Sequence, residues 1–186
     1  MKNLKMLGLS ALAVMALIGP AGQASASVTS PAGTVYTGTL EASITHSFLL
    51  KAGFAEITCS LSVLKGKIEN NIGTFAIGKI STLSFSLCGS STVDVLSNGS
   101  LEIFSTGAGK GDLRGYSTQI TVATMGISCV YGTTTQTPIG TITGGTQPVM
   151  SIAASLPKIS GGFLCANPAS WTGAYKLTTP HELLVD

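Results

Sequence analysis

Hydrophobic and polar residues alternate along most of the chain beyond about residue 35. The clearest alternating segments are residues 57–63, 82–87, 116–123 and 171–177. A period of two is typical of strands that bury one face. No window of a dozen residues in this part of the chain keeps the apolar spacing of an amphipathic helix, and Thr146–Leu156 is the best candidate for a helical turn. The pattern predicts an all-β fold, specifically an antiparallel β-sandwich of immunoglobulin-like or jelly-roll-like type.

Short polar breaks separate the alternating segments and predict where the chain turns. Asn98-Gly99 stands between two such segments and predicts a two-residue hairpin, because both residues tolerate a positive φ. The many Gly, Ser and Thr residues elsewhere favour short connections between strands.

The first 26 residues have a different pattern. Lys2 and Lys5 precede an apolar run, Met6–Ile18, and Gly19-Pro20 then breaks any helix before Ala24-Ser25-Ala26. This order is typical of a secretory signal peptide with a small-residue cleavage site. We therefore expect a signal helix in residues 1–26, a single mature β-sandwich domain in residues 27–186, and a secreted, periplasmic or cell-surface protein.

Charge excludes one class of partner. The chain has ten basic and eight acidic residues, a net charge of +2, and the predicted signal removes Lys2 and Lys5, which leaves eight of each and a net charge of zero. A neutral domain offers no electrostatic surface for nucleic acid. No apolar run after the signal reaches the roughly 20 residues that cross a bilayer, so we expect no transmembrane segment in the mature chain.

The chain contains four cysteines, Cys59, Cys88, Cys129 and Cys165. An even number in an exported protein predicts two disulfides, and three pairings are possible. We favour Cys59–Cys88 and Cys129–Cys165, because each pair lies within one half of the chain. Each bridge would contribute about 3–4 kcal/mol in the loop-entropy description. No C-x-x-C pair is present, which argues against a zinc site.

Cys88 does not follow the apolar parity of its strand and falls on the Ser/Thr face just before Gly89. We expect a bulge or corner there that turns the thiol inward.

The residues that could carry catalysis are few. His46 and His181 are the only histidines, no G-x-S-x-G turn marks a nucleophile, and the carboxylates are scattered. We therefore expect no enzyme activity, no catalytic residues, no cofactor and no metal site. A hydrolase would need one histidine within hydrogen-bond reach of a serine and a carboxylate.

Trp171 and Tyr175 share one face of an alternating segment, and Leu177 continues that face. Two interpretations follow. The face packs in the core, as most amphipathic strand faces do, or it forms a ligand surface for a lipid, a hydrocarbon or a glycan.

The segment that follows the predicted signal carries a resemblance to a known family. Residues 28–39, Val-Thr-Ser-Pro-Ala-Gly-Thr-Val-Tyr-Thr-Gly-Thr, and the later Ile57-Thr58-Cys59-Ser60 resemble the secreted bacterial proteins called protein activator of alkane oxidation, the PraB-like group. The resemblance covers about the N-terminal third of the chain. It implies an exported, non-catalytic accessory protein that acts at the cell surface or on apolar growth substrates, and it assigns no functional residue.

The sequence thus predicts a non-enzymatic, disulfide-bonded accessory protein of the cell surface or extracellular matrix, which aids growth on, or adhesion to, apolar substrates. Self-association through open strand edges and attachment to matrix components are the expected contacts. The alternative is an extracellular binding module for an apolar small molecule or a glycan.

Overall fold

The structure, a computed structural model, describes residues 27–53 and 55–186. The predicted signal peptide, residues 1–26, lies outside the described residues. Within the described residues every regular element is a strand, and no helix is long and apolar enough to cross a membrane. The strands are β1 (Val28–Thr29), β2 (Thr39–Ile44), β3 (Phe48–Ala52), β4 (Ala55–Cys59), β5 (Leu61–Ile72), β6 (Phe75–Ser86), β7 (Thr92–Ser97), β8 (Ser100–Gly107), β9 (Lys110–Tyr116), β10 (Gln119–Thr124), β11 (Ile127–Gly132), β12 (Thr137–Thr143), β13 (Val149–Leu156), β14 (Lys158–Gly161), β15 (Ala169–Thr179) and β16 (Leu184–Val185).

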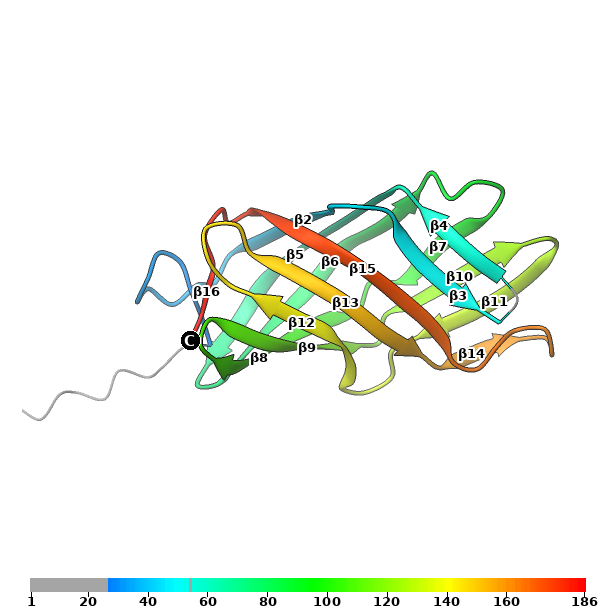
Figure 1. The fold of residues 1–186 in the computed structure, drawn as a ribbon. Helices are drawn as coiled ribbons and strands as arrows, with labels where there is room; N and C mark the ends of the chain where they lie inside the picture. Colours follow the sequence, from blue (N-terminus) through cyan, green and yellow to red (C-terminus); the bar gives the residue numbers. More distant parts are fainter. Residues whose placement is uncertain (1–26, 54) are drawn as a thin grey trace, which may run out of the picture.

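Eight strands close into an antiparallel barrel (Figure 1). They follow the order β13-β12-β9-β8-β6-β5-β2-β15, and β15 pairs back with β13 from Val149↔Lys176 to Leu156↔Ala169. The all-β prediction is confirmed, but the predicted sandwich is wrong. A sandwich strand and a barrel strand both bury alternate residues, so the alternating pattern does not distinguish the two.

A second sheet extends the molecule beyond the barrel. It has the strand order β14-β11-β10-β7, and β3 and β4 continue the barrel wall on the other side. The chain passes between this sheet and the barrel at six connections, which are β6–β7, β7–β8, β9–β10, β11–β12, β13–β14 and β14–β15. Figure 1 shows the result as an elongated body with β16 at one end and the tips of β10, β11 and β14 at the other.

Asn98-Gly99 is one of these passages, and the predicted hairpin is wrong because β7 and β8 belong to different sheets. The Asn98 side chain replaces part of the strand pairing. Its Oδ1 accepts a hydrogen bond from Leu83 N at 3.1 Å, and its Nδ2 donates to Ser81 O at 2.9 Å. Gly99 has φ 66°, and a Cβ there would lie 2.0 Å from Tyr116 O. Glycine is therefore required where the chain crosses from one sheet to the other.

Within the segment Thr146–Leu156, residues 149–156 form strand β13 and no helical turn is present, so that prediction is wrong as well. Met150, Ile152, Ala154 and Leu156 alternate on the buried face of β13. Residues with good helical propensity are thus held in a strand by pairing with β12 and β15 on both sides.

The two ends of the molecule are closed in different ways. At the end that we call the terminal end, β1 pairs with β16 and covers the barrel core with Val28 and Val185. Buried Asn71 holds this cover in place. Its Nδ2 donates to Val28 O at 2.6 Å and to Tyr36 O at 2.9 Å, and its Oδ1 accepts from Val28 N at 3.3 Å.

The opposite end, which we call the distal end, is closed by covalent bonds. The structure contains the disulfides Cys59–Cys88 and Cys129–Cys165, which is the pairing favoured from the sequence. The predicted corner next to Cys88 is present, since Leu87 has φ 55°. Two disulfides indicate that the chain folds in an oxidising compartment, which is the extracellular space or the periplasm.

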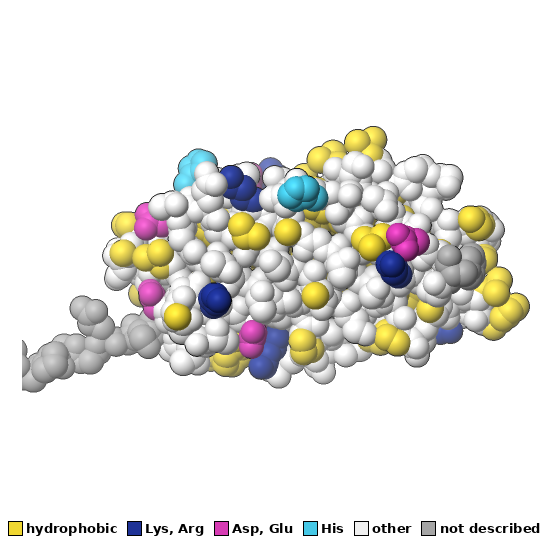
Figure 2. All heavy atoms as spheres, in the orientation of Figure 1, with side chains coloured by type: hydrophobic (Ala, Val, Ile, Leu, Met, Phe, Trp, Pro, Cys, Tyr) yellow, Lys and Arg dark blue, Asp and Glu magenta, His cyan; other side chains and the backbone are white. Residues whose placement is uncertain are grey.

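The face of the molecule that Figure 2 shows is mostly uncharged. Charged side chains are scattered over it, and the ion pairs among the described residues are Lys51–Glu56 at 3.0 Å and Lys65–Glu41 at 3.1 Å. Both pairs are exposed, so each adds little to stability.

Candidate functional site

Trp171 and Tyr175 both lie on β15 and point into the protein. Their relative exposures are 6% and 0%. Trp171 lies where the barrel meets the distal half and is paired with β3. Tyr175 is four residues further along β15, inside the barrel, and is paired with β2. Of the two interpretations drawn from the sequence, the structure supports core packing, and these residues offer no surface on which a ligand could lie.

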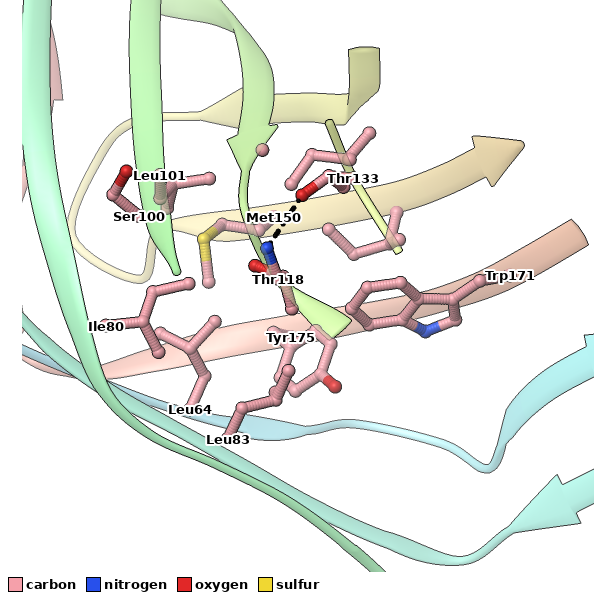
Figure 3. Close-up of a pocket in the computed structure, with 13 residues that line it drawn as sticks. Leu64, Ile80, Leu83, Ser100, Leu101, Thr118, Thr133, Met150, Trp171 and Tyr175 are labelled. Carbon is pink, nitrogen blue, oxygen red and sulfur yellow. Dashed lines mark hydrogen bonds between the residues drawn. The ribbon is translucent and has the colours of Figure 1, made fainter. Parts of the chain in front are cut away.

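A small cavity lies beside the two aromatic side chains (Figure 3). Leu101, Thr118 and Thr133 are among the residues on its other walls, and the space open to the centre of a water molecule is ≈ 20 Å³. A single water needs about 10–15 Å³ on this measure, whereas sites for drug-sized ligands measure about 300–1,000 Å³. This cavity therefore has room for about one water molecule and none for a lipid, an alkane chain or a sugar.

The polar tip of Tyr175 is satisfied inside this apolar region. Its hydroxyl lies 2.6 Å from Ser62 Oγ, and Ser62 Oγ in turn donates to Ser84 O at 2.8 Å. Burial raises the pKa of Tyr175 to about 12 from its usual 10. This chain of hydrogen bonds fixes the ring position in the barrel, and it gives the tyrosine a structural role.

The raised pKa predicts a loss of stability at high pH. The folded protein keeps the Tyr175 proton up to about pH 12, whereas the unfolded chain releases it near pH 10. The stabilisation is complete below pH 10 and is lost as the pH rises from 10 to 12, by about 2–3 kcal/mol in total. Urea unfolding at several pH values should show a smaller loss for Tyr175→Phe than for the native chain. Equal losses in the two proteins would contradict the assignment.

The residues considered for catalysis are not brought together. Both histidines are exposed (cyan in Figure 2). His46 Nδ1 lies 3.2 Å from Thr45 Oγ1, within hydrogen-bond distance. Within residues 27–53 and 55–186 no three His, Cys, Asp or Glu side chains lie close enough to hold a metal ion. The described structure thus contains no serine, histidine and carboxylate arrangement of the kind considered above.

One carboxylate, Glu102, is buried, and the sequence did not indicate it. It lies on the outer face of β8, where it accepts a hydrogen bond from the Tyr116 hydroxyl. Arg114 is its cross-strand neighbour, and the Arg114 guanidinium lies 4.6 Å from the centre of the Phe104 ring. The hydrogen bond from Tyr116 gives the buried carboxylate a partner across the β8–β9 strand pair, and Arg114 lies over the Phe104 ring on the same pair of strands.

An open groove lies outside β6 and the Asn98 crossing, with a volume of ≈ 600 Å³. Glu69 and Lys79 are its charged residues. The amide of Asn98 also lines it, but that amide is already bonded to Ser81 and Leu83. No aromatic side chain lines the groove, so it lacks the flat apolar surface on which a sugar ring would stack.

Sequence reasoning missed a set of apolar side chains at the distal end. Leu87, Met125 and Phe163 lie in three different loops and are 71%, 82% and 93% exposed. A signal was available in the sequence, because each stands one or two residues from a glycine in a turn, where an apolar side chain has little chance of burial.

Comparison with known proteins identifies no relative. No family model, no curated protein sequence and no solved structure matches this chain.

Proposed function

We propose that this protein is a secreted, non-enzymatic accessory protein of the cell surface or extracellular matrix, which promotes adhesion to, or growth on, apolar substrates. The observation that carries the proposal is the filled interior. With Trp171 and Tyr175 in the core and a cavity of ≈ 20 Å³, contacts with other molecules fall to the outer surface. The alternative of an internal binding site for a lipid, hydrocarbon or glycan is disfavoured by the same observation.

Free strand edges supply one means of attachment. The barrel has none, but the distal half ends its sheets at β4, β7 and β14. The edge of β14 is short, carries Lys158 and contains a register shift, all of which hinder pairing with another strand. The edges of β4 and β7 have no proline, and they offer backbone groups to a second copy or to an extended segment of a matrix component.

The proposal is tested with protein collected from the culture medium. Its mass should show cleavage after residue 26 and two disulfides, and the protein should adhere to washed cells or extracellular matrix, or collect at a hexadecane–water interface. A monomeric protein of equal size, charge and stability serves as the control. If the chain stays monomeric and binds cells, matrix and hexadecane no better than the control, the proposal is wrong.

A further inference from the structure

Three loops at the distal end carry exposed apolar side chains that the fold does not use. Leu87 follows β6, Met125 lies in the β10–β11 turn, and Phe163 lies between β14 and β15. Figure 2 shows hydrophobic side chains at this end of the molecule. Single exposed apolar residues are common on protein surfaces, but three at one end, each more than two-thirds exposed, call for an explanation.

Two of these residues also occupy backbone conformations that favour other residue types. Leu87 has φ 55° and Met125 has φ 51°. Met125 and Gly126 (φ 76°) form a two-residue hairpin turn with both φ angles positive, for which Asn-Gly is the usual choice. A bulky side chain at positive φ is strained. Leu87 and Met125 therefore stabilise the folded protein neither by burial nor by a favourable backbone conformation. Residues that disagree in this way with their local structure are typical of functional positions.

The apolar loops are held rigidly. Two of the three loops are fixed by a disulfide, because Leu87 is adjacent to Cys88 and Phe163 lies two residues before Cys165. Met125 lies in a tight turn between the paired strands β10 and β11. Lys158 fixes the Phe163 loop further, since its Nζ donates to Cys165 O at 3.2 Å and to Gly162 O at 3.4 Å. Rigid presentation lowers the entropy cost of binding.

The chemistry of the three loops selects the partner. Residues 87–91, 125–126 and 162–168 contain no charged side chain. They combine the apolar tips with Gly, Ser and Asn, whose backbone and side-chain polar groups need hydrogen-bond partners. Bulk alkane offers no such partners, whereas the headgroup region of a bilayer has phosphate and ester oxygens next to the acyl chains. Separate protruding tips suit a fluid phase better than a second copy, because a second copy would have to supply matching pockets.

We infer that the distal end is a membrane-docking surface, in which Leu87, Met125 and Phe163 insert into the interfacial region of a bilayer of zwitterionic lipids. The inference rests on the surface role proposed above and names its partner. Because the loops are uncharged, binding should change little with anionic lipid content or with salt concentration. The β1–β16 cover at the terminal end would then face away from the membrane.

The test measures co-sedimentation with phosphatidylcholine vesicles. Leu87→Ser, Met125→Asn and Phe163→Ser should each weaken partitioning about tenfold, the loss expected when one buried apolar side chain is removed. The triple variant should not bind measurably. Ile72→Ser is the matched control, because Ile72 is 63% exposed at the last position of β5, next to the β5–β6 turn at the terminal end. It should bind as the native chain does.

Two readouts separate loss of binding from loss of folding. Met125→Asn should unfold at the same or a higher temperature than the native chain, since Asn tolerates positive φ. Phe163→Trp places an indole at the distal end, while the single native tryptophan, Trp171, is already buried. The fluorescence of Phe163→Trp should shift to shorter wavelength on addition of vesicles, and that of Ile72→Trp should not.

Several outcomes would overturn the inference. These are equal losses in Ile72→Ser and the distal variants, binding that rises with phosphatidylserine and falls with salt, and a distal-end dimer that the same variants dissociate. A native chain that adheres to cells or hexadecane but not to vesicles would leave the proposed function standing and reject the membrane-docking surface. A chain that binds vesicles through the distal loops but adheres to neither cells nor matrix would leave the membrane-docking surface standing and reject the proposed function.

Discussion

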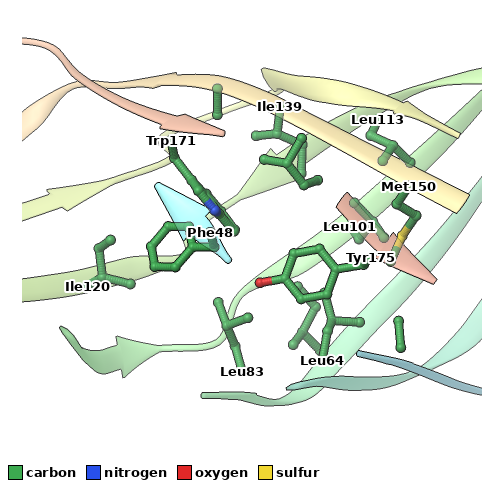
Figure 4. Packing of buried hydrophobic residues seen from close by; sticks show 14 of the residues in the cluster. Phe48, Leu64, Leu83, Leu101, Leu113, Ile120, Ile139, Met150, Trp171 and Tyr175 are labelled. Atoms are coloured by element: carbon green, nitrogen blue, oxygen red, sulfur yellow. The ribbon is translucent and has the colours of Figure 1, made fainter. Parts of the chain in front are cut away.

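Replacing Trp171 with alanine is expected to lower the free energy of unfolding by about 3–5 kcal/mol. Trp171 lies where the barrel wall continues into the distal half, next to the buried Phe48 (Figure 4). The ring centre is 5.9 Å from that of Phe48, with an interplanar angle of 84°, and 5.8 Å from that of Phe85, with an angle of 81°. Phe48 is fully buried, so alanine would leave a cavity between the two halves.

The control for this substitution is Trp171→Phe. Trp171 Nε1 is buried without a hydrogen-bond partner among the described residues. Phenylalanine keeps most of the packing and removes that unpaired group, so its cost should be well below that of alanine. Because both variants lack the only tryptophan, urea unfolding is followed by far-ultraviolet circular dichroism. A loss below about 1 kcal/mol for Trp171→Ala would be typical of a surface position and would place the ring outside the core.

Alternation in the sequence predicts strands well because burial on one face is a local property. It does not predict which strands become neighbours. The barrel closes because β15 is long enough to pair with β2 near Leu177, with β3 near Trp171 and with β13 along its other edge. No local pattern in residues 169–179 encodes three partners, so closure could not be read from the chain.

The crossings between sheets were hidden for a related reason. Asn98-Gly99 has the composition of a hairpin turn, and its positive-φ glycine is present as expected. A rule based on the turn residues alone cannot predict that the Asn98 side chain forms hydrogen bonds with β6, because those partners lie 15 and 17 positions away in the sequence. Tertiary hydrogen bonds thus decide between folding back and crossing over.

For the candidate site, the sequence pattern was informative about the core and uninformative about the surface. Sequence parity correctly placed Trp171 and Tyr175 on one face, yet that face is the core. Met125 and Phe163 lie in turns, where alternation has no meaning, and so their exposure could not be read from a periodic pattern. Leu87 ends the alternating segment 82–87, which predicts its burial, and that prediction is wrong because β6 ends at Ser86 and the chain turns at Leu87. Their grouping at one end depends on the three-dimensional arrangement of loops 38 residues apart in each step, from 87 to 125 and from 125 to 163.

Removing the Cys129–Cys165 disulfide is expected to cost about 4 kcal/mol, because the bridge closes a segment of 36 residues and restricts the unfolded chain. The bridge joins β11 to the loop that carries Phe163, and β14 beside it is a short edge strand with a register shift. The Cys129→Ala/Cys165→Ala variant should therefore lose amide-exchange protection first in β11 and β14, while β8 and β9 in the barrel stay protected.

The Cys59→Ala/Cys88→Ala variant gives the matched comparison. It opens a segment of 29 residues, so the global loss of stability should be similar, but β3 and β4 should lose protection in place of β11 and β14. Urea unfolding and hydrogen exchange of both variants separate the two contributions. If either variant loses protection evenly over the barrel and the distal half, the disulfides act on the fold as a whole. The disulfides would then not stabilise the distal end separately from the barrel. In that case the rigid positions of Leu87 and Phe163 would not depend on the disulfides.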